Sequence, residues 1–310
     1  MRAGRWLRDL TLLSYNFAVG SRVAWLASEW LRSGVAPTPR PMGSSVAFIL
    51  AGQLRGFLSV EVQHSIANTI GSSDLFVHLT LSESQTASRG AITMAAHRLG
   101  AARVKLVADI NSSETVSSCP SLVRSWPGAM FHRFRSAWLH LWECFEMALE
   151  HEATVRAGRS YVYFVKLRSD EQICSALPPM RNWASGTTVH TWQPLPRCEQ
   201  AGARRRSCHA TDDHLAIVPR AIAETFFSAY LEAGGACDAA AYAPFCAWSA
   251  GTMKYSQDVP AECLLGRWLS RANVSVDRGG LLGVRNACMW NNATLVREGC
   301  VCLHGNVSRA

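Results

Sequence analysis

The segment Val46-Ala-Phe-Ile-Leu-Ala51, followed directly by Gly52, decides how this chain is expected to fold. A short, uninterrupted apolar run that ends at a turn residue is typical of a strand buried on both faces of a sheet. Further strands are expected over 74–79, 103–108, 161–167, 187–192 and 214–218, and helices over 57–70, 131–151, 220–231 and 260–268. Because strands alternate with helices, the sequence predicts an α/β, Rossmann-like fold with a mostly parallel central sheet flanked by helices.

The composition and a linker pattern predict one folded domain behind a leader. The chain has 310 residues, of which 48% are apolar and 17% are charged, and this is enough for a sizeable core. Residues 33–45 hold three prolines and two glycines, which is typical of a linker. We therefore assign residues 1–44 to a basic leader with a Pro-rich linker, and residues 45–310 to a single domain.

The leader begins with basic residues and continues with an apolar stretch. Arg2, Arg5 and Arg8 precede the apolar residues that run from Leu10 to Val19. This pattern resembles a signal or anchor sequence, through which the chain could associate with a membrane. No apolar run reaches the ~20 residues of a membrane-spanning helix. An amphipathic helix and a transit peptide remain as alternatives.

The cysteines and the glycosylation acceptors favour the secretory pathway. Eleven cysteines are compatible with an oxidising compartment, and because no Cys-x-x-Cys pair occurs, neither a zinc ribbon nor a thioredoxin motif is expected. Four asparagines begin Asn-x-Ser/Thr triplets: Asn111, Asn273, Asn292 and Asn306. We expect a location in the Golgi lumen, or in another organelle if the leader is a transit peptide. The net charge of +8 is not gathered into a basic cluster, so no nucleic-acid partner is expected.

Polar residues come directly after the first expected strand, and ligands of parallel sheets bind beyond the carboxyl ends of the strands. Gly52 allows the backbone to approach a ligand closely. The amide of Gln53 can contact a base or a ribose, and the planar guanidinium group of Arg55 fits a phosphate. A solvated surface turn is the alternative interpretation.

Charged residues also follow one later strand and precede another. Asp170 could bind a divalent cation, Mn²⁺ or Mg²⁺, that neutralises a diphosphate leaving group, and Arg168 could assist or partly replace that metal. A purely structural Arg–Asp pair is the alternative. Asp212 and Asp213 precede a buried strand, where one could act as general base or metal ligand and the other as a cap. His78, expected at the end of its strand, is a binding candidate or a core histidine.

These motifs, taken in their order along the chain, resemble a known family. They are Gly-Gln-Leu-Arg-Gly-Phe (52–57), Asp-Leu-Phe-Val-His-Leu (74–79), Leu-Arg-Ser-Asp (167–170), Asp-Asp-His-Leu-Ala-Ile-Val-Pro-Arg (212–220) and Pro-Ala-Glu-Cys-Leu-Leu-Gly-Arg-Trp-Leu (260–269). Their order and spacing resemble the glycosyltransferase-A-like (GT-A-like) domains of the nucleotide-diphospho-sugar transferase superfamily, in particular plant and algal members and some bacterial polysaccharide-synthesis enzymes. The resemblance covers about Ser45 to Asp277.

The resemblance implies roles for individual residues. Gln53 and Arg55 would lie near the nucleotide. Position 168 and Asp170 would occupy the place of an Asp-x-Asp metal motif, but its first acid is replaced by Arg168, which leaves metal dependence open. The segment 212–220 would carry an acceptor-side acid, and Glu262 would orient the acceptor or the sugar.

The resemblance and the residues together give one expected function. The expected nucleotide-sugar-binding residues are Gly52, Gln53, Arg55, His78, Arg168 and Asp170, and the expected catalytic residues are Asp212, Asp213 and Glu262. They imply transfer of a sugar from a nucleotide-diphosphate donor to a glycan or protein acceptor. The alternative is a non-catalytic module that binds a nucleotide or a glycan with the same fold.

Overall fold

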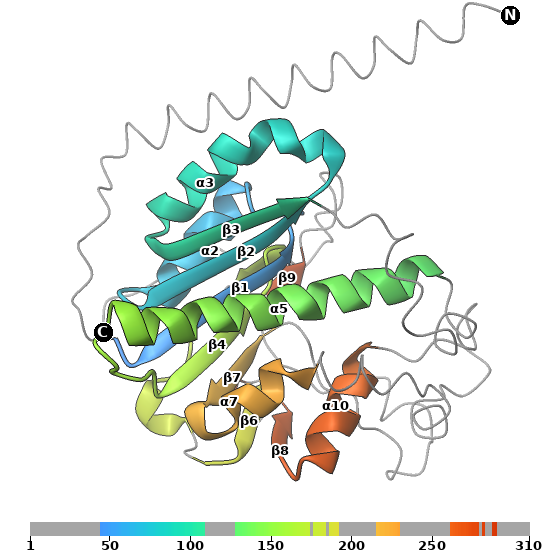
Figure 1. Ribbon diagram of the computed structural model, residues 1–310. Helices are drawn as coiled ribbons and strands as arrows, with labels where there is room; N and C mark the ends of the chain where they lie inside the picture. Colours follow the sequence, from blue (N-terminus) through green and yellow to red (C-terminus); the bar gives the residue numbers. More distant parts are fainter. Residues whose placement is uncertain are drawn as a thin grey trace, which may run out of the picture.

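A seven-stranded sheet forms the centre of the molecule, with strand order β3-β2-β1-β4-β7-β6-β8 (Figure 1). The computed structural model describes residues 44–108, 128–173, 176–183, 186–191, 215–229, 261–278, 281–282 and 287–289. The strands are β1 (Val46–Gln53), β2 (Asp74–Leu81), β3 (Ala101–Ala108), β4 (Tyr163–Leu167), β6 (Thr188–Thr191), β7 (Ala216–Pro219) and β8 (Ser275–Arg278). Strand β7 runs antiparallel to both of its neighbours, whereas the other pairings of this sheet are parallel. The predicted α/β, Rossmann-like class is therefore confirmed.

Helices cover both faces of the sheet. The first face is covered by α2 (Val60–Ile70) and α3 (Arg89–Arg98), and the second by α5 (Gly128–Thr154), α7 (Arg220–Phe227) and α10 (Ala261–Arg271). Strand β1 alternates between the two cores, because Phe48 and Leu50 face α2 while Ala47 and Ile49 face α5. Figure 1 shows α5 crossing the sheet as one long helix. The continuous apolar pattern of β1 is thus explained by burial on both faces.

The sheet has a topological switch point between β1 and β4. From β1 the chain passes through α2 and α3 on the first face to reach β2 and then β3. It then crosses to the second face through α5 and returns on the other side of β1 as β4. In sheets of this kind, a ligand binds outside the carboxyl ends of the two strands where the order reverses.

Helix α5 is fixed to the sheet by a buried aromatic and aliphatic core. Its Phe145 ring packs edge-on against Phe164 of β4 and stacks on Phe227, with ring centroids 4.9 and 4.6 Å apart. Cys144 lies in the same core as a free thiol, and its Sγ is 3.9 Å from the carbonyl oxygen of Leu50. These contacts hold α5 against β1 and β4, next to the switch point.

Several boundaries differ from the sequence-based expectation. Strand β1 continues through Gly52, whose φ of 132° is open to glycine, and ends only at Gln53. Helix α2 begins at Val60 and not at residue 57, because the Ser59 side chain accepts a hydrogen bond from the Val62 amide and caps the helix.

Two features were not predicted. Helix α3 was not predicted because its buried face consists only of Ile92, Ala95 and Ala96, which give a weak apolar pattern. A second, two-stranded sheet pairs β5 (Glu171–Ile173) antiparallel with β9 (Ala287–Met289).

The proposed leader, residues 1–44, lies outside the described residues except for Ser44. In the part of the chain that is described, no helix is both long and apolar enough to cross a membrane.

Candidate functional site

Two arginines follow the two strands that flank the switch point, and both bind the same carboxylate. Arg55 lies in the turn after β1, and Arg168 directly follows β4. Arg55 Nη1 donates to Asp170 Oδ2 at 2.6 Å. Arg168 donates from Nε to Oδ1 at 2.9 Å and from Nη2 to Oδ2 at 3.0 Å. We call Arg55, Arg168 and Asp170 the carboxyl-edge cluster. The structure thus brings together three of the residues that the sequence assigned to nucleotide binding.

Asp170 is held between two strands. It follows the turn after β4 and directly precedes β5, which pairs with β9 through Glu171 and Met289. The Ile173 amide donates to the Ser65 hydroxyl of α2 at 3.1 Å. Because β5 is tied to β9 and to α2, the position of Asp170 is set by the fold.

The end of β1 positions Arg55 in a similar way. The Leu54 amide donates to the Thr80 carbonyl at 3.1 Å, and Leu54 and Phe57 are buried in the core. Between these anchors Arg55 has a φ of 34°, a left-handed conformation that is uncommon for a residue other than glycine. Its Nε donates to the Gln53 side chain at 3.2 Å. The turn therefore directs the Arg55 side chain toward the end of β4.

The ends of β1 and β4 are also joined directly. The Ser169 hydroxyl donates to the carbonyl oxygen of Gln53. Gly52 and Gln53, both expected at the site, thus lie beside the carboxyl-edge cluster, Gly52 within β1 and Gln53 in contact with Arg55 and Ser169. Sequence analysis gave no role to Ser169, which belongs to the motif 167–170, or to Glu171, which directly follows that motif.

The charges of the cluster are unequally exposed. The Asp170 side chain is 2% exposed, that of Arg168 is 18% exposed, and that of Arg55 is 44% exposed. Burial alone would raise the pKa of the Asp170 carboxyl group. The hydrogen bonds and positive charges of Arg168 and Arg55 outweigh this effect and lower the pKa to about 2. Asp170 is therefore ionised at neutral pH, and the part of the cluster that faces solvent is cationic.

This arrangement does not fit a divalent cation at Asp170. Both carboxylate oxygens accept hydrogen bonds from guanidinium groups. The other nearby acid, Glu171, is buried with its Oε1 3.8 Å from Arg168 Nε. Mg²⁺ and Mn²⁺ require several free oxygen ligands, and the described residues around Asp170 do not supply them.

Three expected catalytic residues are not placed by the structure. Asp212 and Asp213 lie outside the described residues, and Glu262 belongs to α10 but its side chain is not described. Strand β7 begins at Ala216, shortly after Asp213 in the sequence, and Ala216 pairs with Lys166 near the carboxyl end of β4. Their catalytic roles stay predictions.

His78 is placed differently from the expectation. Strand β2 continues to Leu81, so His78 is not at its end, and its side chain is fully buried under α5. Its Nε2 lies 2.8 Å from Glu143 Oε2, and its ring stacks on that of His140 with centroids 4.5 Å apart. Lys105 of β3 donates to the same Glu143 oxygen at 2.9 Å.

Burial, together with the charge of His140, lowers the pKa of His78 to about 4 against the opposing attraction of Glu143. The imidazole ring of His78 is therefore neutral at pH 7. Sequence analysis missed His140 and Glu143, although their i,i+3 spacing on an expected helix was the signal that both face one neighbour.

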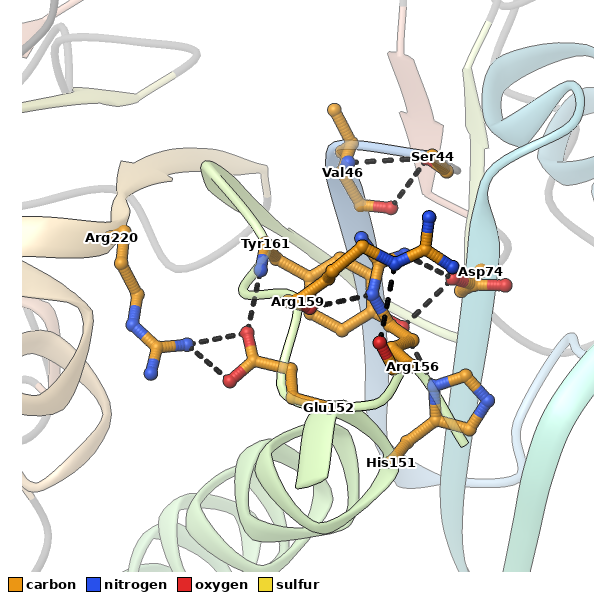
Figure 2. A network of polar contacts seen from close by, with 9 residues as sticks. All are labelled: Ser44, Val46, Asp74, His151, Glu152, Arg156, Arg159, Tyr161 and Arg220. Carbon is orange, nitrogen blue, oxygen red and sulfur yellow. Dashed lines mark hydrogen bonds and ion pairs between the residues drawn. The ribbon is translucent and has the colours of Figure 1, made fainter. Parts of the chain in front are cut away.

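A second arginine–acid network closes the opposite, amino edge of the sheet (Figure 2). Asp74 Oδ2 accepts from the Tyr161 hydroxyl at 2.8 Å and from Arg156 Nη1 at 3.1 Å. The Arg156 guanidinium group also lies 4.0 Å over the Tyr161 ring. Glu152 accepts from Arg220 at 2.6 and 2.7 Å and from the Tyr161 amide at 2.6 Å. We call these five residues the amino-edge network.

Comparison with known proteins finds no protein-family model and no curated protein that matches this chain. Among solved structures, a nucleoside-diphosphate-sugar pyrophosphorylase from Vibrio cholerae RC9 is 14% identical and matches 74% of this chain and 89% of its own, with a TM-score of 0.32. The galactosyltransferase LgtC, in complex with donor and acceptor sugar analogues, is 14% identical over 72% of this chain and 70% of its own, with a TM-score of 0.36.

Mouse xyloside xylosyltransferase 1 is 10% identical over 71% of this chain and 80% of its own, with a TM-score of 0.30. At TM-scores this low these three structures decide neither family nor function, and the fold assignment rests on the strand order of the sheet.

Proposed function

We propose that this chain transfers a sugar from a nucleotide-diphosphate donor to a glycan or protein acceptor. The observation that carries the proposal is the pair of guanidinium groups, Arg55 and Arg168, at the switch point of the sheet. A diphosphate is the ligand whose charge and oxygen spacing suit two neighbouring guanidinium forks. The location at the carboxyl ends of parallel strands is where such ligands bind in this class of sheet.

The cluster would act by binding and stabilising the leaving group. Negative charge grows on the diphosphate as the bond to the sugar breaks, and positioned guanidinium groups stabilise that charge without reorganising. Asp170 would orient both arginines, and the partly exposed Arg55 would make the first contact. Gln53, bonded to Arg55, would contact the base or the ribose. The general base would come from Asp212 or Asp213.

A binding experiment tests the cluster directly. Isothermal titration should show that UDP or GDP binds to the purified protein, whereas uridine and guanosine bind much more weakly. Arg55→Gln should weaken diphosphate binding about tenfold, since a hydrogen bond to a charged group contributes about 1.5–3 kcal/mol. Arg220→Gln is the matched control, because Arg220 is 39% exposed and also binds a buried acid, but at the amino edge. Equal losses in both variants would refute the proposed site.

Turnover needs a separate measurement. A panel of nucleotide sugars should reveal one donor from which the protein releases the nucleoside diphosphate, faster when an acceptor glycan is present. We place this reaction in the Golgi lumen, in keeping with the glycosylation acceptors and the leader.

A second candidate function is a binding module without catalysis. It is favoured by the bonding of Asp170, whose carboxylate is occupied by both arginines and is not free to serve as a base. This alternative predicts nucleotide-dependent stabilisation with no donor turnover for any sugar in the panel. Loss of turnover in Asp213→Asn with retained UDP binding would instead support catalysis.

A further inference from the structure

His78, His140 and Glu143 form a cluster between β2 and α5 that the proposed sugar transfer does not use. His140 and Glu143 lie one turn apart on α5, and both face His78 of β2. One nitrogen from each histidine and one carboxylate oxygen lie within 4.8 Å of one another. We propose that these three residues bind a divalent transition-metal ion of the Zn²⁺ type.

The burial of the two histidines favours a ligand at this place. His78 is fully buried and His140 is 2% exposed. The His78 nitrogen that faces the cluster is Nε2, which lies 2.8 Å from Glu143 Oε2. A neutral imidazole is the form that donates a lone pair to a metal. Coordination through Nε2 would therefore use a nitrogen that already points toward the proposed carboxylate ligand.

The kind of donor selects the class of ion. Imidazole nitrogens with one carboxylate oxygen suit Zn²⁺, Co²⁺, Ni²⁺ or Fe²⁺, whereas Mg²⁺ and Ca²⁺ prefer oxygen ligands alone. Three protein ligands would leave a fourth position for water. Glu143 is 28% exposed, so its carboxylate lies on the open side of the cluster and can adjust to bonds of about 2.0–2.2 Å.

Lys105 would be the competitor of the metal. Its ammonium group binds Glu143 Oε2 at 2.9 Å, at the carboxylate that the metal would use. The Lys105 side chain is 45% exposed, so it can move into solvent when an ion enters. The cluster therefore has two states, one with the carboxylate neutralised by lysine and one with it bound to metal. This inference is independent of the proposed sugar transfer.

The chain contains its own matched control. Glu150 lies two turns beyond Glu143 on α5 and pairs with Arg103 of β3, as Glu143 pairs with Lys105 of the same strand. Among the described residues Glu150 forms no ion pair with a histidine, and it is 61% exposed. Glu143→Gln and Glu150→Gln therefore remove the same charge from the same helix, but only Glu143→Gln removes a proposed ligand.

The test is a titration of the full chain with Co²⁺, after removal of any affinity tag and of bound metal with EDTA. We expect one Co²⁺ to bind, with visible absorption typical of nitrogen and oxygen ligands and without thiolate charge-transfer bands. Glu143→Gln should weaken binding about tenfold or more, and Glu150→Gln should leave it unchanged. Failure of the native chain to bind Co²⁺, or equal binding by Glu143→Gln, would overturn the proposal.

A third variant keeps the test decisive if Glu143→Gln does not fold. Lys105→Met removes the competing ammonium group and leaves all three proposed ligand residues unchanged. Co²⁺ should therefore bind about fivefold more tightly. Unchanged or weaker binding in this variant would contradict the competition on which the site depends. Circular dichroism of each variant reports whether the helices are retained.

Discussion

The two edges of the sheet carry the same chemistry to different effect. At the amino edge, Arg156 is 9% exposed and its partner Asp74 is 19% exposed, and the pair also satisfies the Tyr161 hydroxyl. At the carboxyl edge, Asp170 is just as thoroughly bonded, but Arg55 remains 44% exposed. Exposure alone does not separate the two edges, because Arg220 at the amino edge is also 39% exposed while it binds Glu152. What distinguishes Arg55 is its position at the carboxyl ends of the strands beside the switch point, where ligands bind in sheets of this kind.

The largest expected effect is at the amino edge. Asp74→Ala should lower the free energy of unfolding by about 3 kcal/mol, because it leaves the buried guanidinium group of Arg156 without its carboxylate and removes one of the hydrogen bonds of the Tyr161 hydroxyl, which keeps His151 as a partner. Urea denaturation measures this loss, and UDP affinity should not change in the folded variant. A loss below about 1 kcal/mol would show that this edge is not closed by the network.

At the carboxyl edge the expected effect falls on binding. The double variant Arg55→Gln/Arg168→Gln should bind UDP about 100-fold more weakly, which corresponds to about 2.7 kcal/mol. If one diphosphate contacts both arginines, the two single effects should not add up to the double effect. Titration calorimetry on the four proteins gives this coupling. Strict additivity would contradict this coupling and would mean that each guanidinium group acts independently of the other.

The next largest effect is the pH-dependent contribution of Asp170 to the free energy of unfolding. Its pKa of about 2 lies below the usual value, so its ion pairs stabilise the fold above about pH 4 and are lost as the pH falls through 2. Asp170→Asn should be less stable by about 2 kcal/mol at pH 7, and this difference should shrink between pH 4 and 2. Urea titrations of both proteins across this range measure it. A difference that stays constant down to the lowest pH would contradict the shift.

The smallest effect concerns backbone strain. Ala157, in the loop before β4, has a φ of 53°, and Arg55 at the opposite edge has a φ of 34°. Ala157→Gly should stabilise the protein by about 0.5 kcal/mol, because relief of the left-handed conformation slightly exceeds the greater freedom of glycine when unfolded. Differential scanning calorimetry should show a small rise in Tm. Arg55→Gly, by contrast, should lose UDP affinity even if it gains stability.

The carboxyl-edge cluster could be anticipated because its signals are local. Arg55 and Asp170 each follow a recognisable buried strand, and parallel strands end at one edge. The bonding of Asp170 could not be anticipated, because it depends on the turn at Arg55 and on β5, a strand of three residues. For this reason the sequence suggested a metal where the structure has two guanidinium groups.

The histidine cluster, by contrast, could not be predicted from sequence patterns. His78 was noticed, but its role depends on which residues of α5 lie over β2. That packing is set by core contacts such as those of Phe145 with Phe164, far apart in sequence. Periodicity identified the helix and its buried face, but it could not tell which turn of the helix would meet His78.

The buried position of Cys144 makes it possible to measure how fast α5 separates from the sheet. Its thiol is fully buried against β1, and burial raises its pKa, so it is neither reachable nor ionised while the helix is packed. Alkylation at this position requires the helix to lift away from the strands. The rate at which the peptide containing Cys144 gains an alkyl group, followed by mass spectrometry, therefore times that opening. A metal ion bound between β2 and α5 should slow the alkylation of Cys144.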